Sequence, residues 1–265
     1  MNNRIDAMFE KKKEQGRKAL ITFITAGDPD VDTTRRLVLA MAASGADLIE
    51  LGVPYSDPVA EGPVIQAANV RALKNDVRLD VLFGLVESLR ADTQAPIVFL
   101  LYFNSILQYD ADRFFGRCRA AGVDGVIVPD LPLEESDEVH SISRRYGVRL
   151  IRMVAPTSGK RIEAIAEKAE GFLYCVSSLG VTGMRASFST DFEEFFGRIN
   201  RSKAAPCAVG FGVSTPEQAA ALRAYCDGVI VGSAIVKRVA EAKDAGAAVE
   251  EVAAFVKSLR EALDE

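Results

Sequence analysis

Short apolar runs rich in valine and isoleucine alternate with longer, charged segments from one end of the chain to the other. Runs of this length without polar alternation are typical of strands buried on both faces, as in a parallel sheet covered by helices. We therefore expect eight strands, at residues 19–25, 46–53, 96–102, 125–130, 148–154, 172–177, 207–212 and 228–233.

The segments between these runs carry apolar residues at three- and four-residue spacing, which predicts amphipathic helices. Clear examples are residues 33–44, 79–91 and 111–121. Some helix ends can be predicted as well. Gly122 follows one such segment, where a left-handed cap is wanted, and Thr215 precedes a proline at a helix start.

Repeated strand-helix units are the direct inference from this alternation. Eight units in about 250 residues fit a (β/α)8 TIM barrel better than a doubly wound sheet, because residues 25–29 (TAGDP) lack the glycine-rich dinucleotide turn. Residues 2–14 predict an extra N-terminal helix and residues 246–263 a final amphipathic one. We expect residues 1–265 to form a single domain.

One acidic residue interrupts the second strand. Side chains alternate along a strand, so Glu50 shares a face with Leu48 and Gly52, and the fully apolar opposite face should meet the helices. Glu50 is then expected inside the barrel near the carboxyl end of its strand, where TIM barrels carry their chemistry. An ion pair with Arg149 or Arg152 is the structural alternative.

The loop after that strand adds two more acids, Asp57 and Glu61. Asp57 precedes a proline, an ordinary way to start a turn, and Glu61 is also explained as an acid near a helix amino end. A second carboxylate beside Glu50 would allow acid and base duties to be divided between them.

Glycines end several later strands just before helices begin. Their backbone N–H groups suit an anion, and barrels often hold a phosphate on the loops after strands seven and eight. The predicted phosphate group comprises Gly183, Gly212, Gly232 and Ser233. Each glycine alone is also explained as a turn residue.

Composition narrows the possible partners. The formal net charge is −5 and the pI about 5.2, which disfavours nucleic acid. No apolar run is long enough to span a bilayer and no secretory signal is evident, so a cytoplasmic location is expected, without membrane contact. We interpret the four cysteines as reduced core residues with no metal, and His140 as a surface helix residue.

Six motifs in register give the chain a family resemblance. The stretches IELGVPYSDPVAEGPVIQ, ITAGDP, PDLPLEES, SSLGVTG, GFGVSTPEQ and GSAIVK together resemble the tryptophan synthase alpha subunit over essentially the whole chain. The resemblance implies a TIM-barrel lyase of tryptophan biosynthesis that cleaves indole-3-glycerol phosphate by a retro-aldol reaction to indole and glyceraldehyde 3-phosphate.

The resemblance also implies roles for individual residues. Glu50 matches the family's principal catalytic glutamate, and Glu61 stands where the second carboxylate is usually an aspartate. Thr182 matches a loop residue that closes onto that carboxylate, in a loop where Ser178 replaces a common arginine. The family's phosphate and indole sites correspond to Gly183, Gly212, Gly232 and Ser233, and to Phe23, Leu100, Tyr174 and Phe211. Phe23 and Tyr174 have a purely structural explanation as well, as side chains that pack the interior of the barrel.

A partner follows from the resemblance too. It is the pyridoxal phosphate-dependent beta subunit, which receives indole in an alpha2beta2 heterotetramer, with Asp57 at or near the interface; this chain would need no cofactor itself. Two alternatives stay open. One is another phosphosugar barrel, an isomerase or epimerase, and the other is a catalytically weak subunit that mainly activates its partner.

Overall fold

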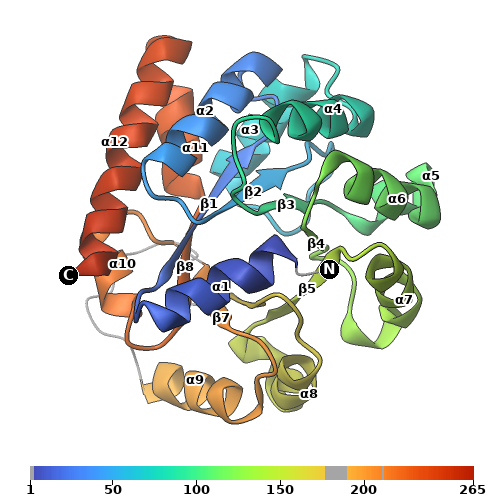
Figure 1. The fold of residues 1–265 in the computed structure, drawn as a ribbon, viewed down its shortest axis with the longest axis vertical. Coiled ribbons are helices and arrows are strands. Elements are labelled where there is room, and N and C mark those ends of the chain that lie inside the picture. The colour runs from blue at the N-terminus through green and yellow to red at the C-terminus, as the bar shows by residue number, and fades with distance from the viewer. Residues whose placement is uncertain (1–2, 177–189, 211) are drawn as a thin grey trace.

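The computed structural model describes residues 3–176, 190–210 and 212–265. Its eight parallel strands close into a barrel in chain order, with β1 pairing both β2 and β8 (Figure 1). The strands are β1 Ala19–Thr25, β2 Leu48–Gly52, β3 Ile97–Leu100, β4 Gly125–Ile127, β5 Arg149–Val154, β6 Leu173–Val176, β7 Cys207–Gly210 and β8 Gly228–Val231. The expected (β/α)8 fold is confirmed.

Helices surround the barrel, and two follow each of strands β2, β3 and β8 (Figure 1). They are α1 Arg4–Glu14, α2 Val31–Ala43, α3 Pro63–Leu73, α4 Leu79–Leu89, α5 Phe103–Tyr109, α6 Ala111–Ala121, α7 Asp137–Arg145, α8 Ile162–Glu167, α9 Thr190–Ser202, α10 Pro216–Leu222, α11 Ser233–Glu241 and α12 Ala245–Asp264. Two 3-10 turns add η1 Leu133–Glu135 and η2 Pro156–Arg161.

Two predicted helix ends are confirmed. Gly122 closes α6 in the left-handed conformation, with φ of 89°. The Thr215 hydroxyl accepts a hydrogen bond from the Gln218 N–H at 3.3 Å, which caps the start of α10. These local signals act without help from distant residues, which is why the sequence reveals them.

Strand side chains alternate between two apolar cores. On β2, Ile49 and Leu51 pack outward into the large core beneath the helices, whereas Leu48 faces the lumen. The lumen core is built from residues of seven strands and from Phe172, directly before β6: Ala19, Ile21, Leu48, Val98, Ile127, Ile151, Phe172, Ala208 and Ile230. Burial on both faces explains why the strands are nearly continuous in apolar residues.

Helix α1 covers one end of this lumen. Its Ile5 and Phe9 join the lumen core, and the Phe9 ring lies 5.8 Å from the ring of Phe172. Gly125, at the start of β4, leaves space for Ile5, since a Cβ there would come within 2.9 Å of the Ile5 side chain. The extra N-terminal helix expected from the sequence therefore plugs the amino end of the barrel (Figure 1).

An aspartate repeats just before three of the strands at the same end. Each carboxylate accepts the N–H of a residue at the start of the preceding strand, at 2.9 Å in every case: Asp47 from Leu20, Asp124 from Ile97, and Asp227 from Cys207. Each also pairs with a buried or half-buried cation, as in Asp124 with Arg90 at 2.8 Å. The repeated aspartates thus tie neighbouring strands together at the amino end of the barrel.

Candidate active site

Glu50 lies inside the barrel, on the second strand. It stands opposite Phe23 of β1 on one side and Val98 of β3 on the other, and its side chain is fully buried. The prediction from strand alternation is therefore confirmed for its position, while its catalytic role stays a prediction.

The carboxyl group of Glu50 is buried without a partner. Within the described residues, neither of its oxygens has a hydrogen-bond partner. Burial alone raises the pKa of this carboxyl from 4.5 to about 8, because the charged form loses its hydration. The group therefore holds its proton at neutral pH and is able to release it slightly above.

An ion pair of Glu50 with a strand arginine, the structural alternative, is wrong. The Arg149 guanidinium instead pairs with Asp6 at 2.5 Å and with Glu170 at 3.4 Å. Arg152 donates a hydrogen bond to the Ser136 hydroxyl. It lies on the face of β5 that turns away from the lumen, together with Leu150 and Val154.

Two aromatic rings and two glycines shape the lumen around Glu50. A Cβ on Gly52 would come within 2.5 Å of the Phe23 ring, and a Cβ on Gly210 within 2.5 Å of the Tyr174 hydroxyl. Burial and, after it, the charge of Glu50 raise the pKa of Tyr174 well above its usual value. The glycines leave the space that the rings occupy, so the rings close in on the carboxyl group.

Leu100 extends the apolar wall from β3. It packs both against the lumen core and against the separate cluster of Phe23, Ala68 and Val236. Phe23, Leu100 and Tyr174 thus all pack on the lumen side of the barrel, while their role as a substrate pocket stays a prediction. The fourth expected pocket residue, Phe211, lies outside the described residues.

Glu61 lies in the loop between β2 and α3, half-buried, and is bound by a residue that the sequence interpretation missed. The Tyr102 hydroxyl donates to the Glu61 carboxylate at 2.5 Å and accepts the Ala60 N–H at 2.9 Å. The Tyr55 ring stacks on Tyr102 at 4.8 Å. Tyr102 follows β3 and has the same parity as Leu100. The sequence could therefore have indicated that its hydroxyl lies on the same side as the expected pocket residue Leu100.

Opposing effects set the proton affinity of Glu61. Desolvation raises the pKa of its carboxyl, the hydrogen bond from Tyr102 lowers it, and the charge of Asp130 raises it; the net direction is upward. Burial and the hydrogen bond to Glu61 in turn raise the pKa of Tyr102. A second carboxyl group with a raised pKa therefore lies on the neighbouring loop, in surroundings unlike those of Glu50.

The predicted phosphate residues are partly described. Gly232 is the residue before α11, and Ser233 begins that helix and is exposed. Gly212 adopts a left-handed φ of 66° on the β7 loop and is exposed too. The first N–H groups of a helix have no partner within it, so the start of α11 suits an anion. Thr182, Gly183, Ser177 and Ser178 lie outside the described residues.

Asp57 lies at the exposed outer part of the loop that carries Glu61. The Ser56 hydroxyl donates to its carboxylate, which fits the expected turn. Two residues further on, Val59 is 83% exposed, an unusual position for a large apolar side chain. The tip of the loop is therefore open to solvent.

The barrel, its buried protonatable carboxyl group and the free helix start at its carboxyl-end loops together define a TIM-barrel enzyme. The chain belongs to the tryptophan synthase alpha chain family, because the model of that family, described as "Tryptophan synthase alpha chain", matches residues 9–264. The resemblance found in the sequence is thus confirmed.

Individual relatives agree with this assignment. The tryptophan synthase alpha chain of Thermoanaerobacter sp. (strain X514) is 49% identical over 261 residues, which cover 98% of this chain and all of the relative. The crystal structure of the alpha chain from Legionella pneumophila matches with a TM-score of 0.90 at 37% identity, covering all of this chain and 98% of that one.

A further solved structure, from the tryptophan synthase a2b2 complex of the hyperthermophile Pyrococcus furiosus, matches with a TM-score of 0.85 at 36% identity. It covers 92% of this chain and 98% of that one.

Among the helices that the structure describes, none combines the length and apolar character needed to cross a bilayer.

Family membership carries the function with it. The chain is a lyase of tryptophan biosynthesis, and the reaction of its family is the retro-aldol cleavage of indole-3-glycerol phosphate. This favours the lyase over an isomerase or epimerase that acts on another phosphosugar.

Proposed function

We propose that this chain cleaves the carbon-carbon bond of indole-3-glycerol phosphate with Glu50 as the group that moves the protons. The observation that carries this is the fully buried Glu50 carboxyl group, unpaired among the described residues, with a pKa of about 8. A general acid-base group works best when its pKa lies near the working pH.

The proton balance of the reaction needs only one such group. Protonated Glu50 gives its proton to C3 of the indole ring, which leaves positive charge on the ring nitrogen. The Glu50 carboxylate then takes the proton of the glycerol hydroxyl as the carbon-carbon bond breaks. The electrons of the broken carbon-carbon bond return to the indole ring and neutralise the charge on its nitrogen. The products are indole and glyceraldehyde 3-phosphate, and Glu50 is protonated again.

Glu61 is proposed to stabilise the charge that develops on the ring. A carboxylate beside the indole N–H gains interaction energy as the ring nitrogen becomes positive, and Tyr102 fixes its direction. Glu61 is one methylene longer than aspartate, the usual family residue, and the hydroxyl of Tyr102 gives the longer side chain a defined anchor.

The remaining expected residues would bind the two ends of the substrate. Phe23, Leu100 and Tyr174, together with Phe211, would contact the indole ring. Gly212, Gly232 and Ser233, with Gly183, would bind the phosphate through backbone N–H groups, and Thr182 would approach Glu61. The support is the apolar wall beside Glu50 and the exposed start of α11.

A beta subunit that uses pyridoxal phosphate is the proposed partner, in an alpha2beta2 assembly. This chain itself is proposed to need no cofactor. It would act in the cytoplasm, as a single domain of residues 1–265. Exposed Asp57 and Val59 on the loop beside Glu61 support a contact there. Mixing the chain with a beta subunit of a family member should give a stable complex by analytical ultracentrifugation and a faster release of indole.

Indole release from indole-3-glycerol phosphate tests the proposal. Glu50→Gln should lower kcat by at least about a hundredfold, the usual contribution of a general acid-base group, while the melting temperature shows that the protein is folded. Glu167→Gln, an exposed position on α8, is the matched control and should keep the parental rate. Full activity of Glu50→Gln would overturn the assignment of this residue.

The class of substrate has its own test. Indole-propanol phosphate, which carries both the aromatic ring and the phosphate, should raise the melting temperature of the parental protein in a saturable way. No shift at saturating concentrations would instead favour a phosphosugar without the ring.

A further inference from the structure

Asp130 lies in the loop after β4 and has no part in the reaction proposed above. The loops after β3 and β4 are neighbours, because the Leu101 N–H donates to the Ile127 carbonyl at 3.0 Å. Asp130 also borders a cavity of about 260 Å³ that the lumen-side residues Ile151 and Met153 line. The acid therefore lies at the carboxyl end of the barrel, beside the lumen.

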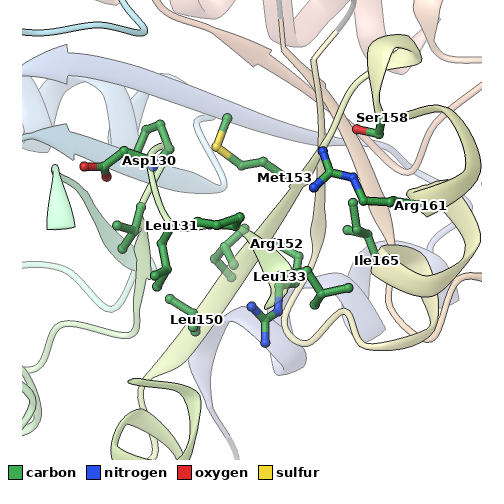
Figure 2. Close-up of a pocket in the computed structure, with 13 residues that line it drawn as sticks. Asp130, Leu131, Leu133, Leu150, Arg152, Met153, Ser158, Arg161 and Ile165 are labelled. Atoms are coloured by element: carbon green, nitrogen blue, oxygen red, sulfur yellow. The ribbon is translucent and has the colours of Figure 1, made fainter. Parts of the chain in front are cut away.

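The Asp130 carboxylate binds the backbone of the neighbouring loop. Its Oδ1 accepts the Phe103 N–H at 2.9 Å. Figure 2 shows the carboxylate pointing away from Arg152 and Arg161, two cations that line the same cavity. The carboxylate is therefore directed at the loop after β3 and joins the two loops.

The N–H that Asp130 accepts follows directly on Tyr102. Phe103 begins α5, and Tyr102 precedes it in an extended conformation, with φ of −81° and ψ of 148°. The Tyr102 carbonyl accepts the Ser105 N–H at 3.0 Å. Both polar groups of the peptide between Tyr102 and Phe103 are thus bound. This fixes the backbone from which the Tyr102 ring extends to Glu61.

Asp130 also acts on Glu61 through its charge. Desolvation raises the pKa of Glu61 most, the Tyr102 hydrogen bond lowers it, and the negative charge of Asp130 raises it. In the described part of the chain, Tyr102 and Asp130 are the titratable side chains that shift this pKa. Asp130 is exposed, so solvent screens its charge. We therefore expect its hydrogen bond to matter more than its charge.

We propose that Asp130 is a positioning residue of the active site, which fixes Tyr102 and so sets the direction of the Glu61 carboxylate. This rests on the proposed role of Glu61. The contacts run from Asp130 to the Phe103 N–H, and from the adjacent Tyr102 hydroxyl to Glu61. Small errors in the direction of a catalytic group lower the rate, so Asp130 affects a reaction that it does not touch.

Indole release by the full-length chain, measured without a beta subunit, tests the hydrogen bond. Asp130→Ala should lower kcat about fivefold, within the range of one hydrogen bond. Asp130→Asn keeps an oxygen that accepts the Phe103 N–H, so its kcat should stay within about twofold of the parental value. Glu134→Ala removes an exposed acid a few residues further on and should keep the parental rate. Equal loss in the alanine and asparagine variants would overturn the proposal.

A double-mutant cycle shows whether Asp130 acts through the Tyr102 hydroxyl. In Tyr102→Phe this hydroxyl is gone, so adding Asp130→Ala should lower kcat by less than about twofold further. A purely structural effect of Asp130 would add its full fivefold loss in both backgrounds. That additive result would overturn the proposal.

The titration of Glu61 keeps this test separate from the lyase assignment. Carbon-13 NMR of glutamate-labelled protein measures it without substrate, and Glu61→Gln assigns the resonance. Asp130→Asn should lower the pKa of Glu61, because a negative charge is removed. Asp130→Ala should leave this pKa higher than Asp130→Asn does, since alanine also releases the Tyr102 hydroxyl. Equal pKa values in the two variants would overturn the positioning role, even in a protein that released no indole.

Phe103→Pro keeps the test decisive if Asp130→Ala fails to fold. Proline removes the N–H that Asp130 accepts, and the first position of a helix tolerates proline. Phe103→Ala keeps the N–H and is the matched control. The proline variant should therefore have a kcat about fivefold below that of the alanine variant. Equal rates in these two variants would overturn the proposal.

Discussion

At the scale of single residues, the two carboxyl groups of the site differ in their surroundings. Glu50 is fully buried without a described partner, whereas Glu61 is half-buried and bonded to the Tyr102 hydroxyl. Carboxyl groups in unlike surroundings are able to divide acid and electrostatic tasks. Here the unpaired one suits proton transfer, and the anchored one suits charge stabilisation.

The buried carboxyl group should make stability depend on pH. Its pKa is raised from 4.5 to about 8 in the fold, so the native state binds this proton more tightly than the unfolded chain. Its stabilising contribution is therefore complete below about pH 4.5 and is lost as pH rises toward 8.

Urea unfolding at several pH values should thus show the parental protein losing stability relative to Glu50→Gln between pH 5 and 8. The difference should change by up to about 1.4 kcal/mol per pH unit. Parallel curves for the two proteins over this range would mean that the carboxyl group titrates normally.

Tyr102→Phe should weaken catalysis through Glu61. Losing the hydroxyl removes the hydrogen bond that lowers the pKa of Glu61, so this pKa should rise and kcat should fall about tenfold, roughly the value of one charge-assisted hydrogen bond. A pH-rate profile moved toward higher pH is the specific sign. Tyr55→Phe keeps the stacked ring and should leave the profile unchanged; equal effects of both variants would argue against a role of Tyr102 on Glu61.

Glu61→Asp addresses the remaining alternative of a catalytically weak subunit. Aspartate is one methylene shorter, so we expect it to lose the Tyr102 anchor and to lower the lyase rate. A large gain in lyase rate, with unchanged activation of the beta subunit, would support that alternative instead.

At the scale of elements, strand ends decide the shape of the lumen. The glycines at the ends of β2 and β7 admit the Phe23 and Tyr174 rings, which no larger residue would allow at these distances. Helix α3 completes this wall, because its Ala68 packs on Phe23. The site is thus assembled from several strands and from helices α3 and α11, whose Val236 joins the same cluster.

Gly52→Ala should disturb this assembly. The new methyl group would meet the Phe23 ring, so we expect a loss of about 1–3 kcal/mol in stability, typical of overpacking, together with a lower kcat/KM. Gly84→Ala on α4 is the control, because a Cβ there meets nothing within 4 Å and alanine favours a helix. It should be neutral or stabilising; equal behaviour of the two variants in thermal melts would contradict the packing argument.

The sequence predicts strands better than it predicts their ends or the contacts between loops. The run at residues 125–130 continues past Ile127, where β4 ends, because apolar residues extend into the loop. Helix α5, only 7 residues long, was not predicted, since so short a segment carries little periodicity. The position of Glu50 follows from alternation, whereas the Glu61–Tyr102 bond joins residues 41 apart and needs the folded chain.

At the scale of the whole molecule, the two ends of the barrel have different tasks. The amino end is closed by α1 and tied by the three aspartates before β2, β4 and β8, whereas the carboxyl end carries Glu50 and the loops around it. This division is general in TIM barrels, where the amino end serves stability. Stability and activity should therefore be separable by mutation.

Asp124→Ala tests this separation. Asp124 is 4% exposed and bonds Arg90, Arg4 and the Ile97 N–H, so its loss should cost about 3–5 kcal/mol, as for a broken buried pair. The lyase rate of the folded fraction should stay within about twofold of the parental rate. Glu87→Ala removes an exposed partner of Arg117 and should cost no more than about 0.5 kcal/mol; a similar cost for both would contradict the account.

The most direct test of the account is the titration of the Glu50 carboxyl group itself. Carbon-13 NMR of protein labelled at the glutamate carboxyl carbon, with Glu50→Gln to assign the resonance, measures it without substrate or partner. We expect a carboxyl group that is protonated at pH 6 and titrates near pH 8. A midpoint near 4.5, the ordinary value for a glutamate, would contradict the proposed proton donor.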